Sequence, residues 1–359
     1  MEEALHTLWD EVRDLSLSTA IDCLPTPPTP LRFLRHYVLP NKPCLIAAAV
    51  PHWPALSLWP SNSYLRSVLS DTDVSVHLTP SGKADALVSH PGDPSAVCFA
   101  SAAVRTVAFP EALDLVVASK EGKAVAYLQQ QNDCFRSEYG ALAADCEEEI
   151  PWASEALGCA PEAVNLWIGN RLSETWFHKD HYENLYVVIA GEKRFLLLPP
   201  TDVHRMYVRD YQAARYRYCQ DSGDFTLELE DPTAYVPWCS VDPCPSFEEE
   251  QREIKKFPLY FNGPKPFEVT VKAGEMLYLP SMWFHHVQQS QDDSVLTIAI
   301  NYWYDMQFDI KYAYFNFLQS IPYSPPADPS LSKNKDSSLD ESDIISDRPS
   351  IDTSCNEDG

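Results

Sequence analysis

The sequence is poor in the features that mark several common protein classes. It contains only 11 glycines against 30 prolines, so we expect short elements ended by proline rather than long helices. No stretch approaches the roughly 20 apolar residues of a membrane-spanning helix, and the acidic start, Met1-Glu2-Glu3, differs from the basic start of a signal peptide. We therefore predict a soluble intracellular protein that does not contact membranes.

Basic residues are also scarce. Lysine and arginine number 27 against 52 aspartates and glutamates, which leaves a formal net charge of −25. Such a surface disfavours binding to DNA or RNA, which depends on basic groups that neutralise phosphates. We predict no direct nucleic-acid contact. The charge favours basic partners, although it serves solubility alone equally well.

Paired cysteines are absent as well. The ten cysteines are scattered along the chain, and the nearest pair, Cys239 and Cys244, has no second pair or histidine beside it to complete a zinc site. We predict reduced, mostly buried thiols and no structural zinc.

What the sequence does contain is a series of short apolar segments after Trp152, separated by turn signals such as Ala190-Gly191-Glu192. These segments predict the strands of a jelly-roll or barrel. They are Val164 to Ile168, Asn184 to Ile189, Lys193 to Leu198, Phe267 to Val271, Glu275 to Leu279, Trp283 to Val287 and Val295 to Trp303.

Other parts of the chain flank this series. Residues 1–17 have the apolar spacing of an amphipathic helix, and residues 305–320 have so much apolar surface that a second copy of the chain could pack there, as in a homodimer. A long polar excursion, at about 205–255, either borders a site or is a passive loop. Residues 321–359 are rich in serine, proline and aspartate, and we predict a disordered acidic tail.

Two metal-ligand side chains occur one residue apart in the stretch Thr175-Trp-Phe-His-Lys-Asp180. Alternate residues of a strand point to the same face, so His178 and Asp180 would direct an imidazole and a carboxylate toward one point. A second histidine would complete a 2-His-1-carboxylate triad, the usual metal site of non-haem Fe(II) oxygenases. The alternative for this pair alone is a hydrogen-bonded contact on a loop.

A later apolar strand supplies a double histidine, His285-His286. Strand alternation turns only one of the two inward. If Trp283, His285 and Val287 share a face, His285 is the third ligand and His286 points away. His181 has an odd offset from the first two ligands, so we place it on the opposite face.

Motifs from Leu31 to Leu318 resemble the JmjC-domain 2-oxoglutarate oxygenases, in the subgroup similar to the asparaginyl hydroxylase that acts on hypoxia-inducible factor. The residues that carry the resemblance are Pro30-Leu-Arg-Phe33, Tyr127-Leu-Gln-Gln130, Thr175 to Asp180 with Asn184, Gly191-Glu-Lys193, Pro280 with Trp283 and His285, and Asn301-Tyr-Trp-Tyr304. The resemblance implies a mainly β fold, a double-stranded β-helix (cupin-like jelly-roll) at 126–304 with flanking helices, on which residues 1–125 pack. It also implies Fe(II), 2-oxoglutarate and O₂ as cofactor and co-substrates.

The resemblance further implies contacts to 2-oxoglutarate. Lys193 would bind its distal carboxylate, whereas without the triad this residue would be read as a surface lysine in a turn. Tyr127 and Thr175 would add hydroxyl donors to the same carboxylate. Asn184 and Asn301 match positions that line the pocket in the family.

For function, the resemblance implies C3-hydroxylation of a lysyl side chain in GTP-binding proteins of the TRAFAC class, in cytoplasm and nucleus. Two other activities remain open, both directed at histone tails: lysine or arginine demethylation, and arginine-directed peptide cleavage. A non-catalytic scaffold is disfavoured because no member of the triad is missing.

Overall fold

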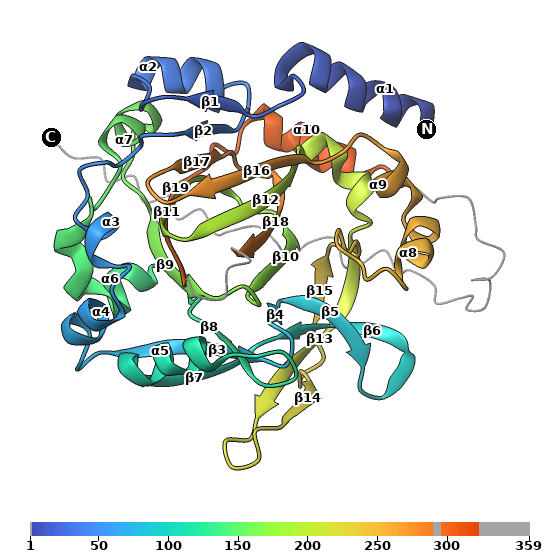
Figure 1. Ribbon diagram of the computed structural model, residues 1–359. Coiled ribbons are helices and arrows are strands. Elements are labelled where there is room, and N and C mark those ends of the chain that lie inside the picture. Colours follow the sequence, from blue (N-terminus) through green and yellow to red (C-terminus); the bar gives the residue numbers. More distant parts are fainter. Residues whose placement is uncertain (1, 290–295, 323–359) are drawn as a thin grey trace, which may run out of the picture. The chain divides into compact units, whose positions relative to one another are not determined.

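Two β-sheets face each other at the centre of the structure, a computed structural model that describes residues 2–289 and 296–322 (Figure 1). The first sheet has six strands, in the order β1 (Asp22–Leu24), β2 (Cys44–Ile46), β17 (Met276–Leu279), β11 (Tyr182–Ala190), β19 (Thr297–Asp305) and β9 (Ala163–Gly169). The second has five, in the order β16 (Phe267–Lys272), β12 (Glu192–Leu198), β18 (Phe284–Gln289), β10 (Glu174–His178) and β4 (Lys83–Ala84). The predicted double-stranded β-helix is therefore confirmed.

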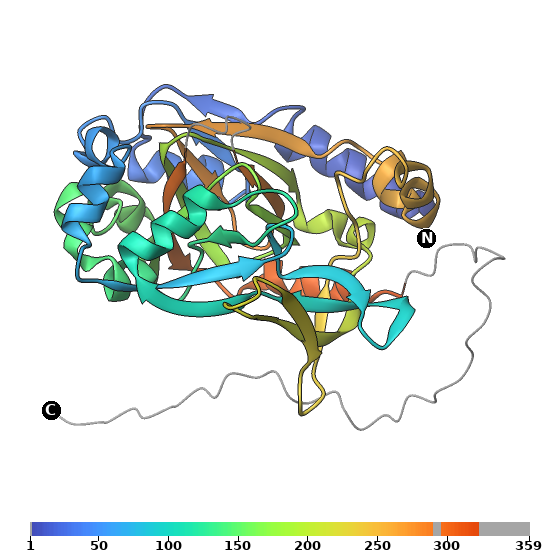
Figure 2. The same ribbon diagram turned by 60° about the horizontal axis from the view of Figure 1, so that its bottom comes forward.

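Two smaller sheets lie beside the barrel. One has the order β7 (Ala103–Ala108), β3 (Asp73–Thr79) and β8 (Val125–Tyr127). The other has the order β14 (Phe225–Leu229), β13 (Arg209–Tyr218), β6 (Asp93–Ser101) and β5 (Ala86–His90), with β15 (Tyr235–Trp238) on β13. Figure 2 shows the β13–β14 hairpin extending away from the barrel.

Short helices connect and flank the sheets. The N-terminal part contributes α1 (Glu2–Val12), the π-helical turn η1 (Arg13–Leu17), α2 (Pro30–Phe33), the π-helical turn η2 (Leu34–Val38), α3 (Ala55–Leu58), α4 (Asn62–Val68), α5 (Phe109–Ala118), α6 (Cys134–Glu138), the 3₁₀ turn η3 (Gly140–Asp145) and α7 (Pro151–Leu157). After the 3₁₀ turn η4 (Pro200–Met206) come α8 (Glu250–Lys256), α9 (Pro258–Asn262) and α10 (Ile310–Ser320). No helix of the described residues is both long and apolar enough to cross a membrane.

The central strand β11 is buried on both faces, which explains its continuous apolar sequence. Leu185, Val187 and Ile189 pack outward against the N-terminal helices and their core. Tyr186 and Val188 point between the two sheets, with side chains of β12, β16 and β18. This inner space, closed by two sheets, is where the candidate site lies.

The excursion predicted as either a site border or a passive loop has its own strands. Its strand β13 pairs in parallel with β6 of the N-terminal region, where Ala213 is opposite Phe99. The excursion is therefore tied to the body of the protein. Beyond Pro322, the predicted acidic tail lies outside the described residues.

The cysteines are less buried than predicted. Nine lie in the described part, all of them free thiols, but only four of these are buried: Cys44, Cys98, Cys134 and Cys239.

Candidate metal centre and co-substrate pocket

Three side chains, one each from β10 and β18 and one from the residues that follow β10, converge at one end of the barrel. His178, Asp180 and His285 have ligand atoms within 4.8 Å of one another, and within the described residues they form the one such group able to hold a metal ion. Nε2 of His178 lies 3.7 Å from Oδ2 of Asp180, and Nε2 of His285 lies 3.6 Å from the same oxygen. The antiparallel pairing of β10 with β18 sets His178 opposite His285.

The Nδ1 atom of each imidazole lies within hydrogen-bond distance of a backbone carbonyl. Nδ1 of His178 is 2.8 Å from the carbonyl oxygen of Trp176, and Nδ1 of His285 is 3.1 Å from that of Trp283. A proton on Nδ1 that is donated to a carbonyl leaves the lone pair of Nε2 free for a metal. Burial and the neighbouring His178 lower the pKa of His285 to about 4, which keeps its imidazole neutral at pH 7. Two imidazoles and one carboxylate are the donor set that non-haem Fe(II) takes.

His286 points to the opposite face of β18. Its Nε2 atom is 2.8 Å from Oε1 of Glu174, and the same carboxylate lies 3.4 Å from the ammonium group of Lys83. His181 is exposed and lies away from the cluster, against the rings of Phe308 and Tyr312. The structure thus places neither histidine at the metal cluster.

Lys193 lies inside the barrel, with only 1% of its surface exposed. Its ammonium group donates to the hydroxyl of Tyr127 at 2.8 Å and lies 5.3 to 5.6 Å from the ring centres of Tyr127, Trp167 and Tyr186. Within the described residues no carboxylate pairs with it. Burial lowers its pKa to about 7, because a charge without a counter-ion is costly away from water. An anionic ligand, such as the distal carboxylate of 2-oxoglutarate, fits this cation.

The Tyr127 hydroxyl accepts hydrogen bonds from several side chains of this pocket. Gln289 donates to it at 3.3 Å, and Thr175 lies close enough for its hydroxyl to bond there too. Thr175 faces Val287 across the pairing of β10 with β18, on the strand that ends in His178. The structure therefore brings Tyr127, Thr175 and Lys193 together.

Asn184 and Asn301 lie on adjacent strands of the first sheet, both buried. The side-chain amide of Asn301 donates to the side-chain oxygen of Asn184 at 3.2 Å, and its own oxygen accepts from the indole of Trp167 at 2.7 Å. Trp167 is also one of the rings around Lys193. The two asparagines are thus linked to the pocket through one shared neighbour.

Sequence reasoning missed two residues here, namely Gln289 and Trp238. The ring of Trp238 stacks on His178 with centres 6.2 Å apart and planes within 8°. Trp238 ends β15, so the excursion borders the site and is not a passive loop. The carbonyl of the next residue, Cys239, accepts from the indole of Trp176 at 3.1 Å, which holds the excursion to β10.

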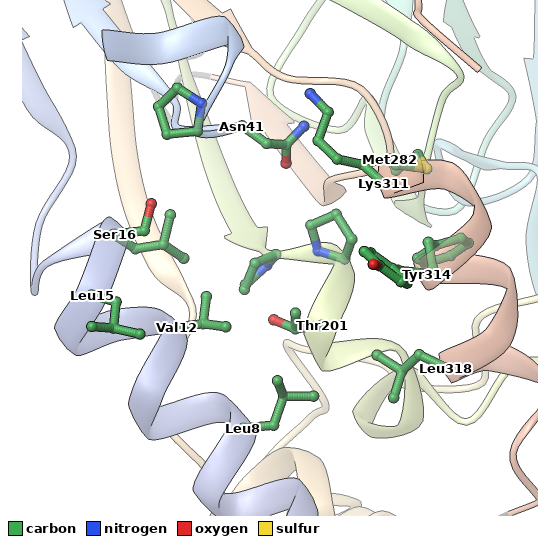
Figure 3. A pocket seen from close by; sticks show the side chains of 15 residues that line it. Leu8, Val12, Leu15, Ser16, Asn41, Thr201, Met282, Lys311, Tyr314 and Leu318 are labelled. Atoms are coloured by element: carbon green, nitrogen blue, oxygen red, sulfur yellow. The ribbon is translucent and has the colours of Figure 1, made fainter. Parts of the chain in front are cut away.

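A separate apolar groove of about 510 Å³ lies between residues 8–17 and α10. Figure 3 shows Leu8, Val12 and Leu15 on one side of it, facing Tyr314 and Leu318 of α10. No residue of the metal cluster lines it.

Comparison with known proteins places this site in a family. The model of the cupin-like domain matches residues 30–310. An Arabidopsis thaliana protein named lysine-specific demethylase JMJ32 is 60% identical over 344 residues, which cover 96% of this chain and 99% of that one. The chain belongs to the JmjC and cupin-like domain family.

Two further members of the JmjC family match most of the chain. The human bifunctional peptidase and (3S)-lysyl hydroxylase JMJD7 is 43% identical over 327 residues, or 89% of this chain and 97% of that one. JmjC domain-containing protein E of Dictyostelium discoideum is 37% identical over 334 residues, or 89% and 93%. The Arabidopsis protein is thus more similar than the human one, although the motifs alone favour JMJD7. Membership in the JmjC family implies an oxygenase that uses Fe(II) and 2-oxoglutarate, and the triad for it is present.

Proposed function

We propose that this protein is an Fe(II)- and 2-oxoglutarate-dependent protein hydroxylase that acts at C3 of a lysyl side chain in GTP-binding proteins of the TRAFAC class. The observation that carries the oxygenase chemistry is the combination of the His178, Asp180 and His285 cluster with the buried cation of Lys193 in the same barrel. The choice of hydroxylation follows the name of the human relative, which is 43% identical.

In this proposal the protein side chains bind and orient. His178, Asp180 and His285 would hold Fe(II), which would supply the site at which O₂ is activated. Lys193 and Tyr127 bind the distal carboxylate of 2-oxoglutarate. Fe(II), 2-oxoglutarate and O₂ supply an oxidation that releases succinate and CO₂ and transfers one oxygen atom to a substrate C–H bond. The apolar side chains between the sheets exclude water, and the site presents one C–H bond.

The protein substrate would approach as a basic partner, in the cytoplasm or nucleus. The net charge of −25 favours association with a lysine-bearing surface, because opposite charges steer diffusional encounter.

Lysine demethylation is the second candidate, because the relative at 60% identity is named a lysine-specific demethylase. Demethylation of histone tails would use the same triad and the same pocket. Arginine-directed peptide cleavage is a third reading, since the human relative is also named a peptidase. Hydrolysis by a metal-activated water would need neither Lys193 nor 2-oxoglutarate, so succinate release by wild-type protein and by Lys193→Ala separates it from the oxygenase activities.

The deciding experiment is tandem mass spectrometry of candidate TRAFAC GTPases and methylated histone peptides incubated with enzyme, Fe(II), ascorbate and 2-oxoglutarate. We expect a gain of one oxygen on a lysine of the GTPase. Loss of methyl groups from the histone peptides, or a cleaved chain, would instead support the second or third candidate.

The matched controls are His178→Ala and Asp180→Ala. Each removes one of three ligands, so we expect substrate-dependent 2-oxoglutarate turnover to disappear while the circular dichroism spectrum is retained. Turnover that persists in both variants would refute the assignment.

A further inference from the structure

A second carboxylate lies near the metal cluster. Asp85 separates β4 from β5, and β4 pairs in parallel with β10, with Ala84 opposite Thr175. Asp85 therefore lies beside the strand that ends in His178, and His178 is one of the two groups whose charge acts on its carboxyl group. Its backbone has φ of +53°, a left-handed conformation that aspartate tolerates better than most residues but adopts rarely.

This carboxylate has no partner in the described part of the chain. No hydrogen bond or ion pair reaches it, and the charged or titratable groups that it senses are His77 and His178. His77 does not neutralise it, because burial lowers the pKa of that imidazole while its Nε2 is 3.0 Å from Oε1 of Gln130. Burial likewise raises the pKa of Asp85, although the residue keeps partial access to solvent. An unpaired carboxylate in such a place is unfavourable unless a cation joins it.

A buried donor without a partner lies on another side of the same histidine. The indole nitrogen of Trp238 is buried and makes no hydrogen bond to any described residue, although its ring stacks on His178. Phe99 packs edge-on against Trp238 with ring centres 4.8 Å apart. Phe99 pairs with Leu87 of β5, the strand that begins directly after Asp85. The small sheet and the residue before β5 thus bring an unused donor and an unused acceptor near His178.

The resident groups do not supply the missing cation. The metal takes its carboxylate from Asp180, and the co-substrate is an anion whose counter-charge is Lys193. A cation for Asp85 is then one that a substrate can bring.

We propose that Asp85 binds the ammonium group of the substrate lysine and so selects which side chain enters the site. This inference rests on the proposed function and narrows it. Asp85 makes no ion-pair contact with His178, whose ring nitrogen does contact Asp180. Asp85 is not one of the three ligands, so an ammonium group held by Asp85 would lie beside the metal and not on it.

The test compares two fluorescent pools of short random peptides that differ only at the central residue, lysine or its uncharged isostere norleucine. Affinity is measured by fluorescence anisotropy in the presence of Mn(II), which replaces Fe(II), and 2-oxoglutarate. We expect wild-type protein to prefer the lysine pool by about tenfold or more, as an ion pair shielded from water can provide. Asp85→Asn should abolish the preference, and Asp85→Glu should retain part of it. Asp93→Asn is the matched control, because Asp93 is an exposed acid of the same small sheet.

Each outcome decides the proposal. A lysine preference that survives in Asp85→Asn, or that is absent from wild-type protein, overturns it. If Asp85→Asn no longer binds 2-oxoglutarate in the same preparation, the residue maintains the site and does not select substrate, which also overturns it. Succinate release in parallel reactions with Fe(II) reports on the proposed function separately. If wild-type protein prefers the lysine pool but releases no succinate, the proposed oxygenase activity is refuted. If succinate is released but the lysine preference does not depend on Asp85, only the role of Asp85 is refuted.

Discussion

Backbone contacts hold all three residues of the metal cluster in place. The imidazoles of His178 and His285 are held by carbonyls two residues earlier, and the carbonyl of Asp180 accepts from the amide of Met282 at 2.8 Å. These contacts link the end of β10 to the turn before β18. Such preorganisation lowers the entropic cost of assembling three ligands around one ion.

The two adjacent histidines of β18 should differ sharply in metal binding. His285→Ala removes an imidazole from the cluster, so we expect loss of Fe(II) or Mn(II) binding in a metal titration. His286→Ala removes the partner of Glu174 instead, and we expect metal binding to remain while the free energy of unfolding falls by about 1 to 3 kcal/mol. Binding retained in the first variant and lost in the second would reverse the choice of ligand.

Lys193 should make 2-oxoglutarate affinity depend on pH. Burial lowers its pKa to about 7 in the ligand-free protein, so the ammonium form is present below pH 7 and is lost as the pH rises. Only the charged form attracts the carboxylate, so we expect the affinity to fall by roughly tenfold for each pH unit above 7. Calorimetric titration with Mn(II) present at pH 6.5 and 8.5 measures this.

Lys193→Arg provides the matched control for that titration. Arginine stays protonated throughout the range, so its weaker binding should be nearly independent of pH. An affinity of the wild-type protein that does not change between the two pH values would contradict a role for Lys193 in binding the carboxylate.

At the scale of elements, the N-terminal helix is joined to the barrel by buried charges. Asp202 of η4 is fully buried and lies 2.9 Å from the guanidinium of Arg13. On its other side it pairs with Arg205, which is also fully buried and donates to the carbonyls of Leu259 and Tyr260. A single carboxylate therefore connects η1, which follows α1 directly, with the turn after β12 and the helix α9.

Loss of that carboxylate should be strongly destabilising. Asp202→Ala leaves the buried guanidinium of Arg205 without its counter-ion, so we expect the free energy of unfolding to fall by about 3 to 5 kcal/mol in a denaturant titration. The comparison is Glu268→Gln, which breaks the exposed pair with Arg194 and should cost no more than about 1 kcal/mol. Equal effects of the two substitutions would show that the Asp202 pair is not the anchor of α1.

At the scale of the whole molecule, apolar side chains remain uncovered around α10. Tyr314 and Phe317 are 65% and 66% exposed, and Leu15 of η1 is 85% exposed across the groove of Figure 3. The same helix lies near the metal site, because the ammonium of Lys179 sits 5.1 Å from the ring centre of Phe315. A second copy of the chain that covers this face would bury apolar surface beside the site.

We predict a homodimer through this face. A concentration series by multi-angle light scattering should give twice the monomer mass of 40.6 kDa at high concentration. Phe317→Glu places a charge in the predicted interface and should yield monomers. Phe247→Glu, at the 91% exposed Phe247, should leave the dimer intact. A monomeric wild-type protein throughout the series would exclude this interface.

Local sequence determined which residues could form the site, because strand alternation is a property of neighbouring residues. The choice between His285 and His286 and the inward direction of Lys193 follow from that period of two. Asp180 lies just beyond the end of β10, so strand alternation proposed its pairing with His178 but does not account for it. Asp85, Gln289 and Trp238 could not be predicted in this way. Each reaches the site through pairing between segments far apart in the chain: β4 with β10, β12 with β18, and β15 with β13. Only the tertiary structure decides such pairings, since their register depends on the packing of whole sheets and not on the residues beside each side chain.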